Sequence, residues 1–104
     1  MSMNAASRHA AREQMIHQQL RAWDVLDPQV LEVFDRVPRE AFVPPAYADL
    51  AYADLEIPLG QGDRMLAPKV AGRILQAVAP RPTDRVLLVG AGTGYLAACL
   101  AARA

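Results

Sequence analysis

An unbroken apolar run leads directly into a glycine-rich loop near the end of the chain, and this feature constrains the fold most. The run lies within Arg85–Val89, and the loop at 90–94 reads Gly-Ala-Gly-Thr-Gly. Apolar runs without alternation are typical of strands covered on both faces, as in parallel sheets. The alanine-rich segment Tyr95–Ala104 favours a helix. The sequence therefore predicts a strand, a glycine loop and a helix in succession, which is the first unit of an α/β fold.

The glycine loop is a candidate binding site for an anionic group. Glycine reaches backbone conformations that are closed to other residues, and it lets a ligand approach the main chain. The helix that follows presents free amides and a partial positive charge. Ligands of open α/β sheets bind beyond the carboxyl ends of the strands. The candidate residues are Gly90, Ala91, Gly92, Thr93 and Gly94.

Three ligand classes compete for this loop, and a plain connecting turn is the simplest alternative. A triphosphate loop needs Gly-Lys-Ser/Thr, which is absent here. The dinucleotide fingerprint needs glycine or alanine where Tyr95 stands, although Gly90 and Gly92 match it. The spacing of the loop glycines resembles motif I of class I methyltransferases, whose loop cradles S-adenosylmethionine. That resemblance implies S-adenosyl-L-methionine as cofactor, with its carboxylate as the anion at the loop.

The residues before this unit predict helices separated by prolines. Ser7 is expected to cap a helix that runs to about Trp23. Asp27 and Pro28 form a stronger start signal, because the aspartate can accept from first-turn amides and proline loses no needed donor. A third helix is expected to open at Pro68. Its predicted buried face is made of Val70, Ile74, Leu75 and Val78, and the aromatic side chains expected in the core are Trp23, Phe34 and Phe42.

A perfect tandem pentapeptide, AYADL, fills 46–55 between the second and third helices. Two copies of five residues are far shorter than any solenoid period, so a local duplication within a short helix or turn is expected. The stretch Glu56–Gly62 is predicted to be extended and then loop-like, with a weak strand near Glu56–Leu59. No strong strand is therefore available beside Arg85–Val89, although a buried parallel strand needs neighbours. We expect the sequence to be the N-terminal part of a longer protein.

Several blocks resemble the protein-L-isoaspartate (D-aspartate) O-methyltransferase family in order and spacing. The most specific is Val37–Pro44, which reads VPREAFVP, and the others are Gln18–Arg21, Asp27–Leu31, Tyr52–Asp54, Pro58–Gly62, Ala67–Pro68 and Asp84–Leu87. The resemblance implies a class I (Rossmann-like) methyltransferase fold, of which this chain holds N-terminal helices and the first strand–loop–helix. It divides the chain into an N-terminal helical and substrate-loop region, 1–82, and the start of the cofactor domain, 83–104. It also implies methylation of isoaspartyl carboxyl groups in damaged proteins or peptides.

Two departures from the family pattern concern the site. The family loop typically reads like GHGQTISQP, and its serine helps to hold the substrate carboxyl group. Leu66 stands in the place of that serine and has no hydrogen-bonding group. Arg64 can bind a carboxylate or remain a solvated loop residue, and Leu88 replaces an acidic residue that orients the cofactor in related strands. The candidate substrate-loop residues are Gly62, Asp63, Arg64 and Leu66.

The composition gives no reason to expect certain classes of partner. The 11 basic and 11 acidic residues balance, which gives no electrostatic argument for nucleic acid or an anionic membrane. Cys99 is the only cysteine, and no stretch suggests a signal peptide, a membrane span or a metal site, so a cytoplasmic protein without metal is expected. Methyl transfer needs positioning more than acid–base chemistry, and no catalytic residue is assigned. A non-catalytic interaction module remains the alternative function, and self-association through the unpaired strand is expected.

Overall fold

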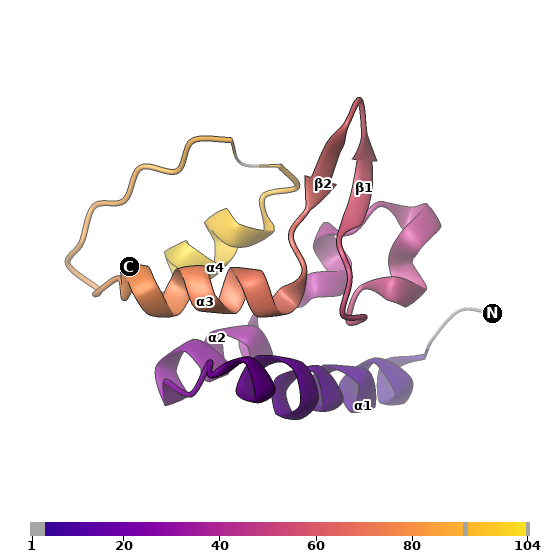
Figure 1. Cartoon of the computed structure of the whole chain (residues 1–104), viewed down its shortest axis with the longest axis horizontal. Coiled ribbons are helices and arrows are strands. Elements are labelled where there is room, and N and C mark those ends of the chain that lie inside the picture. The colour runs from indigo at the N-terminus through magenta and orange to yellow at the C-terminus, as the bar shows by residue number, and fades with distance from the viewer. Residues whose placement is uncertain (1–3, 91, 104) are drawn as a thin grey trace.

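The computed structural model describes residues 4–90 and 92–103 of the chain. It contains four α-helices and one β-hairpin in this part of the chain (Figure 1). The helices are α1 (Ala5–Met15), α2 (Pro28–Arg36), α3 (Pro68–Val78) and α4 (Tyr95–Arg103), and the strands are β1 (Ile57–Gly60) and β2 (Asp63–Met65). Short helical turns continue α1 through Ile16–Leu20 and Arg21–Trp23, and two 3-10 helices occupy Arg39–Phe42 and Pro45–Leu50.

The first two helices begin at side-chain caps, one of which the sequence misplaces. Asp27 accepts from the amide of Gln29 at 2.9 Å and Pro28 opens α2, which confirms that start signal. Helix α1 is capped by Asn4, whose Oδ1 accepts from the amide of Ser7 at 2.8 Å. The predicted cap at Ser7 is wrong, because asparagine three residues earlier satisfies the same free amides and extends the helix.

One hydrophobic core joins all four α-helices and the hairpin. Its fully buried members include Met15, Leu20, Phe34, Ile57, Leu75 and Cys99. Phe42 is half-buried against this core. Trp23 was expected in the core, but it is 46% exposed, so that prediction is wrong. The Nζ atom of Lys69 lies 4.9 Å from the centre of the Trp23 ring. The indole therefore keeps a cation on its face at the surface, which is a favourable arrangement for tryptophan.

Helix α3 has the predicted bounds at its start but a different buried face. Pro68, Ala71, Gly72 and Leu75 are buried, whereas Val78 is 53% exposed and Val70 and Ile74 are half-buried. The cause is a close approach at Gly72, where an added Cβ would lie 2.8 Å from Leu20 Cδ2. Ala71 and Gly72 let α3 pack tightly on the end of the first helical segment. The side of α3 that carries these small residues therefore faces the core, and Val78 faces solvent.

The hairpin β1–β2 is antiparallel, with Ile57 opposite Met65 and Pro58 opposite Arg64. The sequence predicts β1 only as a weak strand and does not predict β2. The tandem repeat before the hairpin folds as two different structures, because its first copy lies mostly in a 3-10 helix and its second in turns. Ala51 and Tyr52 of the second copy are buried, whereas Ala46 of the first copy is exposed.

The predicted strand at Arg85–Val89 is not formed. This segment runs as an extended trace between the end of α3 and the start of α4 (Figure 1), and no hydrogen-bonded strand pairs with it in the described residues. Leu88 is half-buried, but Leu87 and Val89 are 88% and 85% exposed. The physical reason is that a strand needs neighbours for its amides and carbonyls. The described residues therefore hold helices and a small antiparallel sheet, which is consistent with an incomplete fold of the predicted α/β class, although the expected strand itself is not formed.

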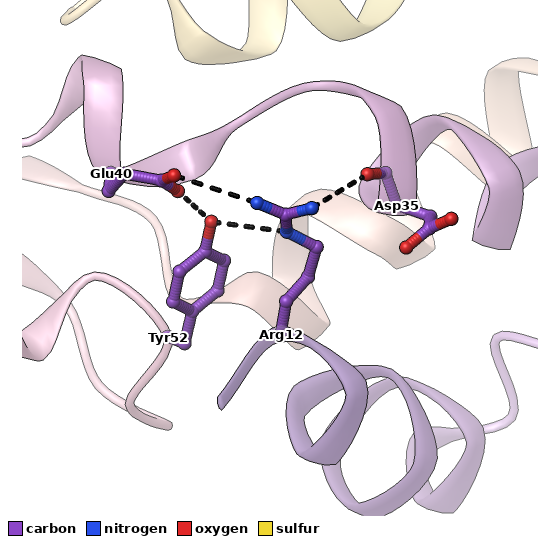
Figure 2. A network of polar contacts seen from close by, with 4 residues as sticks. All are labelled: Arg12, Asp35, Glu40 and Tyr52. Atoms are coloured by element: carbon purple, nitrogen blue, oxygen red, sulfur yellow. Dashed lines mark hydrogen bonds and ion pairs between the residues drawn. The ribbon is translucent and has the colours of Figure 1, made fainter. Parts of the chain in front are cut away.

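A polar network ties the second copy of the repeat to the N-terminal helix (Figure 2). The Tyr52 hydroxyl donates to Glu40 Oε2 and accepts from Arg12 Nε at 3.3 Å. Arg12 Nη2 also lies 3.5 Å from Glu40 Oε1, and Arg12 Nη1 donates to the carbonyl of Asp35 at 3.3 Å. Three segments distant in sequence are thereby fixed together.

Candidate functional site

A small cavity brings the glycine loop and the predicted substrate loop together. It has a volume of about 80 Å³, and the described residues that line it are Arg39, Arg64, Met65, Leu66, Ala71, Gly90, Gly92, Thr93, Tyr95 and Leu96. Two segments more than twenty residues apart therefore face one space. The candidates Gly62, Asp63 and Gly94 do not line it, and Ala91 lies outside the described residues.

The glycine loop has a backbone that only glycine adopts without strain. Gly90 and Gly92 have φ angles of +77° and +56°, in the left-handed region. A Cβ at Gly90 would meet no atom within 4 Å, and one at Gly92 would meet only Leu59 Cδ1, at 3.9 Å. The loop is thus open to a ligand, and helix α4 starts directly after it with nine residues and free first-turn amides. The Thr93 hydroxyl accepts from the amide of Tyr95 at 3.4 Å.

The substrate loop coincides with the hairpin. Gly62 lies in its turn at φ +82°, Asp63 and Arg64 belong to β2, and Leu66 follows that strand. The Arg64 side chain is exposed at the cavity, and within the described part of the chain it makes no ion pair. Leu66 contributes its backbone, because its carbonyl accepts from Arg39 Nη2 at 2.6 Å. The polar group at this position is therefore the main-chain carbonyl of Leu66, and its partner is Arg39.

Arg39 is the site residue that sequence reasoning missed. It is 1% exposed, and its Nε donates to the carbonyl of Ala51 at 2.6 Å. Its guanidinium carbon lies 4.9 Å from the centre of the Tyr95 ring. Arg39 belongs to the block VPREAFVP, and the available signal was its place in the most specific block of the chain. Buried arginines are rare unless they are paired.

The buried side chains of Arg39 and Tyr95 interact beside the cavity. The Arg39 guanidinium and the Tyr95 hydroxyl are in hydrogen-bonding contact with each other, and the hydroxyl also contacts Cys99, although neither Arg39 Nη1 nor the hydroxyl makes a hydrogen bond of ordinary geometry to the described residues. Burial lowers the pKa of the Arg39 guanidinium, and the neighbouring Tyr95 partly offsets this shift. Burial also raises the pKa of Tyr95 well above its usual value and, despite opposing effects of Tyr95 and Arg39, raises the pKa of Cys99 to about 11. Tyr95 is therefore a neutral hydroxyl, able to donate.

The fit of S-adenosylmethionine to this site is partial. The open glycine loop and the helix start suit a carboxylate at the end of a ligand. A cavity of about 80 Å³ is well below the size of a pocket that encloses a whole small molecule. The described residues thus accommodate the amino-acid end of the cofactor, and Leu88 offers no carboxylate for its polar groups.

Other site types find no support in the described part of the chain. No group of three or more histidine, cysteine, aspartate or glutamate side chains there has an arrangement that could hold a metal ion. No helix formed by those residues has both the length and the apolar character needed to cross a membrane. His9 and His17 are exposed on the first helical segment, and Cys99 is fully buried.

Comparison with known proteins shows which family this chain resembles. The family model described as Protein-L-isoaspartate(D-aspartate) O-methyltransferase (PCMT) matches residues 10–103. A protein-L-isoaspartate O-methyltransferase of Aeropyrum pernix is 48% identical over 91 residues, which are 88% of this chain and 35% of the relative. Protein-L-isoaspartate O-methyltransferase 1 of Rhodopseudomonas palustris strain HaA2 is 44% identical over 97% of this chain and 41% of its own length.

A third relative agrees with these two. The protein-L-isoaspartate O-methyltransferase of Methylorubrum extorquens strain PA1 is 48% identical over 90% of this chain and 41% of its own length. The chain thus spans less than half the length of the curated relatives it matches. The match includes Arg39, the hairpin and the glycine loop. This chain belongs to the protein-L-isoaspartate (D-aspartate) O-methyltransferase family.

Proposed function

We propose that the protein is an S-adenosylmethionine-dependent carboxyl O-methyltransferase that acts on isoaspartyl residues of damaged proteins or peptides. The observation that carries this proposal is the shared cavity, which joins the open glycine loop to the hairpin residues Arg64 and Leu66. Methyl transfer requires a donor and an acceptor in one place. A cofactor-type loop and a cationic strand that line one cavity support such a meeting point.

Each side of the cavity has a separate task in this proposal. Gly90, Gly92 and the first turn of α4 receive the amino-acid end of the cofactor. S-adenosylmethionine, when bound, supplies an electrophilic methyl group whose leaving group is a neutral thioether. Because the acceptor would be a carboxylate and the leaving group is uncharged, no residue of this chain would have to move a proton. The protein then needs only to orient the acceptor and exclude water.

Binding of S-adenosylhomocysteine by the full-length protein tests the cofactor half of the proposal. Gly92→Val places a β-branched side chain at φ +56°, where the backbone is strained for any such residue. We expect calorimetry to show at least a tenfold loss of affinity, equivalent to about 1.4 kcal/mol. Gly60→Val, at φ +89° in the hairpin and outside the cavity, is the matched control for backbone strain. Equal affinities of the Gly92→Val and wild-type proteins would refute the assignment of the loop.

Transfer of a labelled methyl group to an isoaspartyl peptide tests the acceptor half. The full-length protein is expected to methylate that peptide and to leave the same peptide with an ordinary aspartyl residue unmodified. Absence of both transfer and S-adenosylhomocysteine binding would instead support a non-catalytic interaction module. The cavity of about 80 Å³ leads us to expect weak or no cofactor binding by residues 1–104 alone.

A further inference from the structure

A single buried side chain joins three segments that are distant in sequence. Arg39 is 1% exposed, and its Nε donates to the carbonyl of Ala51, in the second copy of the repeat, at 2.6 Å. Its Nη2 donates to the carbonyl of Leu66, directly after β2, at 2.6 Å. Its guanidinium carbon lies 4.9 Å from the centre of the ring of Tyr95, the first residue of α4. One planar group therefore contacts the repeat, the end of the hairpin and the helix that follows the glycine loop.

The chemistry of arginine suits this linking position. A guanidinium is planar and holds its N–H groups in fixed directions, so it can donate to two carbonyls while its face lies on an aromatic ring. Burial makes each contact costly to lose, because water does not replace a missing acceptor there. Lysine has one nitrogen on a flexible stem and no planar face. The carbonyl of Leu66 and the ring of Tyr95 thus have a relative position that Arg39 fixes.

The two residues that Arg39 fixes in this way both line the cavity. Leu66 belongs to the predicted substrate loop, and Tyr95 follows the glycine loop. The Tyr95 hydroxyl is in hydrogen-bonding contact with the Arg39 guanidinium, and the Tyr95 amide donates to the hydroxyl of Thr93 in the glycine loop at 3.4 Å. A chain of contacts therefore runs from the glycine loop through Tyr95 and Arg39 to the end of the hairpin.

We propose that Arg39 is a positioning residue that couples the two sides of this cavity. It acts through the carbonyl of Leu66 and the ring of Tyr95. A ligand at the glycine loop holds Tyr95 in place and, through Arg39, holds the end of the hairpin in the arrangement that receives an acceptor. The identity of the two ligands rests on the proposed function, whereas the linkage rests on the contacts of Arg39. Because coupling between two binding sites is reciprocal, each ligand raises the affinity for the other by the same factor.

Paired titrations of the full-length protein measure this coupling. Calorimetry gives the affinity for an isoaspartyl peptide with and without saturating S-adenosylhomocysteine. It also gives the affinity for S-adenosylhomocysteine with and without saturating peptide. We expect the two ratios of affinities to be equal and at least about fivefold. Two ligands that bind independently would give ratios of one.

Two variants separate coupling from binding. Arg39→Lys keeps the charge and loses the planar group, so it is expected to bring the ratio close to one and to change the affinity for either ligand alone by less. Tyr95→Phe keeps the ring that packs against Phe34 and Phe42 and removes only the hydroxyl that contacts Arg39. We expect this variant to lower the ratio by about twofold or more.

Two further variants control for stability and for the loss of an arginine. Gln76→Ala removes a side chain whose Oε1 accepts from the amide of Leu26 at 2.9 Å, so it weakens the fold outside the cavity. Arg73→Lys makes the same chemical change as Arg39→Lys at an exposed residue, which donates to the carbonyl of Trp23 at 3.2 Å. Both variants are expected to keep the ratio of the wild type.

The outcomes distinguish this role of Arg39 from the proposed function. Independent binding of the two ligands to the wild type, or an unchanged ratio in a folded Arg39→Lys protein, would overturn the role. An unchanged ratio in Tyr95→Phe would do so even where Arg39→Lys does not fold. A loss of coupling in Gln76→Ala as large as in Arg39→Lys would mean that stability alone sets the ratio. If neither ligand binds the wild type, the proposed function itself fails, and this role fails with it.

Discussion

The hydroxyl of Tyr52 offers a sharp test of what holds the N-terminal region together. Tyr52→Phe removes one oxygen atom that donates to Glu40 Oε2 and accepts from Arg12 Nε at 3.3 Å (Figure 2). Hydrogen bonds to charged groups contribute about 1.5–3 kcal/mol each. The 3.3 Å distance lies beyond the usual range, and the Arg12 and Glu40 side chains are 20% and 21% exposed, so water replaces part of the loss. We expect a total loss of about 1.5 kcal/mol in the free energy of unfolding.

The tandem repeat supplies a matched control for this substitution. Tyr47 occupies the equivalent position of the first copy and is half-buried, with no hydrogen bond from its hydroxyl in the described part of the chain. Tyr47→Phe is therefore expected to change stability by less than about 0.5 kcal/mol. Urea unfolding at a constant slope measures both variants as shifts of the midpoint. Equal effects of the two substitutions would refute the network as a source of stability.

A double-mutant cycle isolates the interaction itself. Glu40→Gln removes the charge that accepts from Tyr52 and leaves a side chain of the same size. If the two groups stabilise the fold through each other, the losses of Tyr52→Phe and Glu40→Gln are not additive, and the coupling lies at about 0.5–3 kcal/mol. Strictly additive losses would mean that each residue acts through other contacts.

Further predictions concern Cys99 and the extended segment. Because the pKa of Cys99 is raised to about 11 and its side chain is fully buried, alkylation at pH 8 should be at least about 100-fold slower in the folded protein than in denaturant. A free thiol has a pKa of about 8.5. Below that pH the Cys99 thiol is protonated in both the folded and the unfolded state, and as pH rises from there towards 11 the folded state loses stability relative to the unfolded state. Urea midpoints should fall across that window, and less so in Cys99→Ala; a flat profile would contradict the pKa shift. Leu87 and Val89 are 88% and 85% exposed, and we propose that the chain self-associates through this segment. Leu87→Lys should shift sedimentation towards the monomer, and an unchanged profile would place the contact elsewhere.

The sequence predicted the local features of the chain well where one residue type has one physical role. Asp27 and Pro28 start a helix for reasons confined to a single turn, and the structure confirms them. The helical character of Tyr95–Arg103 and the burial of Cys99 follow in the same way from propensity and apolarity. The cap at Asn4 was missed because Ser7 is also a competent cap, and local chemistry alone does not choose between them.

Tertiary contacts decided the features that depend on a neighbour. The apolar run before the glycine loop carries a strand signal, but hydrogen bonding needs a second segment, and none pairs with it in the described residues. The buried face of α3 was set by the fit of Gly72 against Leu20. The two copies of the repeat have one sequence and two environments, which no pattern within the copies can distinguish.

The sequence by itself determined the family, the start of α2 and the glycine loop, because these depend on residue types at fixed spacing along the chain. Only the tertiary structure decided that the buried Arg39 shares one cavity with that loop and with Arg64. Arg39 and Tyr95 are separated by more than fifty residues, so no local pattern in the sequence reveals their contact. It follows from how the helices and the hairpin pack around one core, where the guanidinium carbon of Arg39 lies 4.9 Å from the centre of the Tyr95 ring.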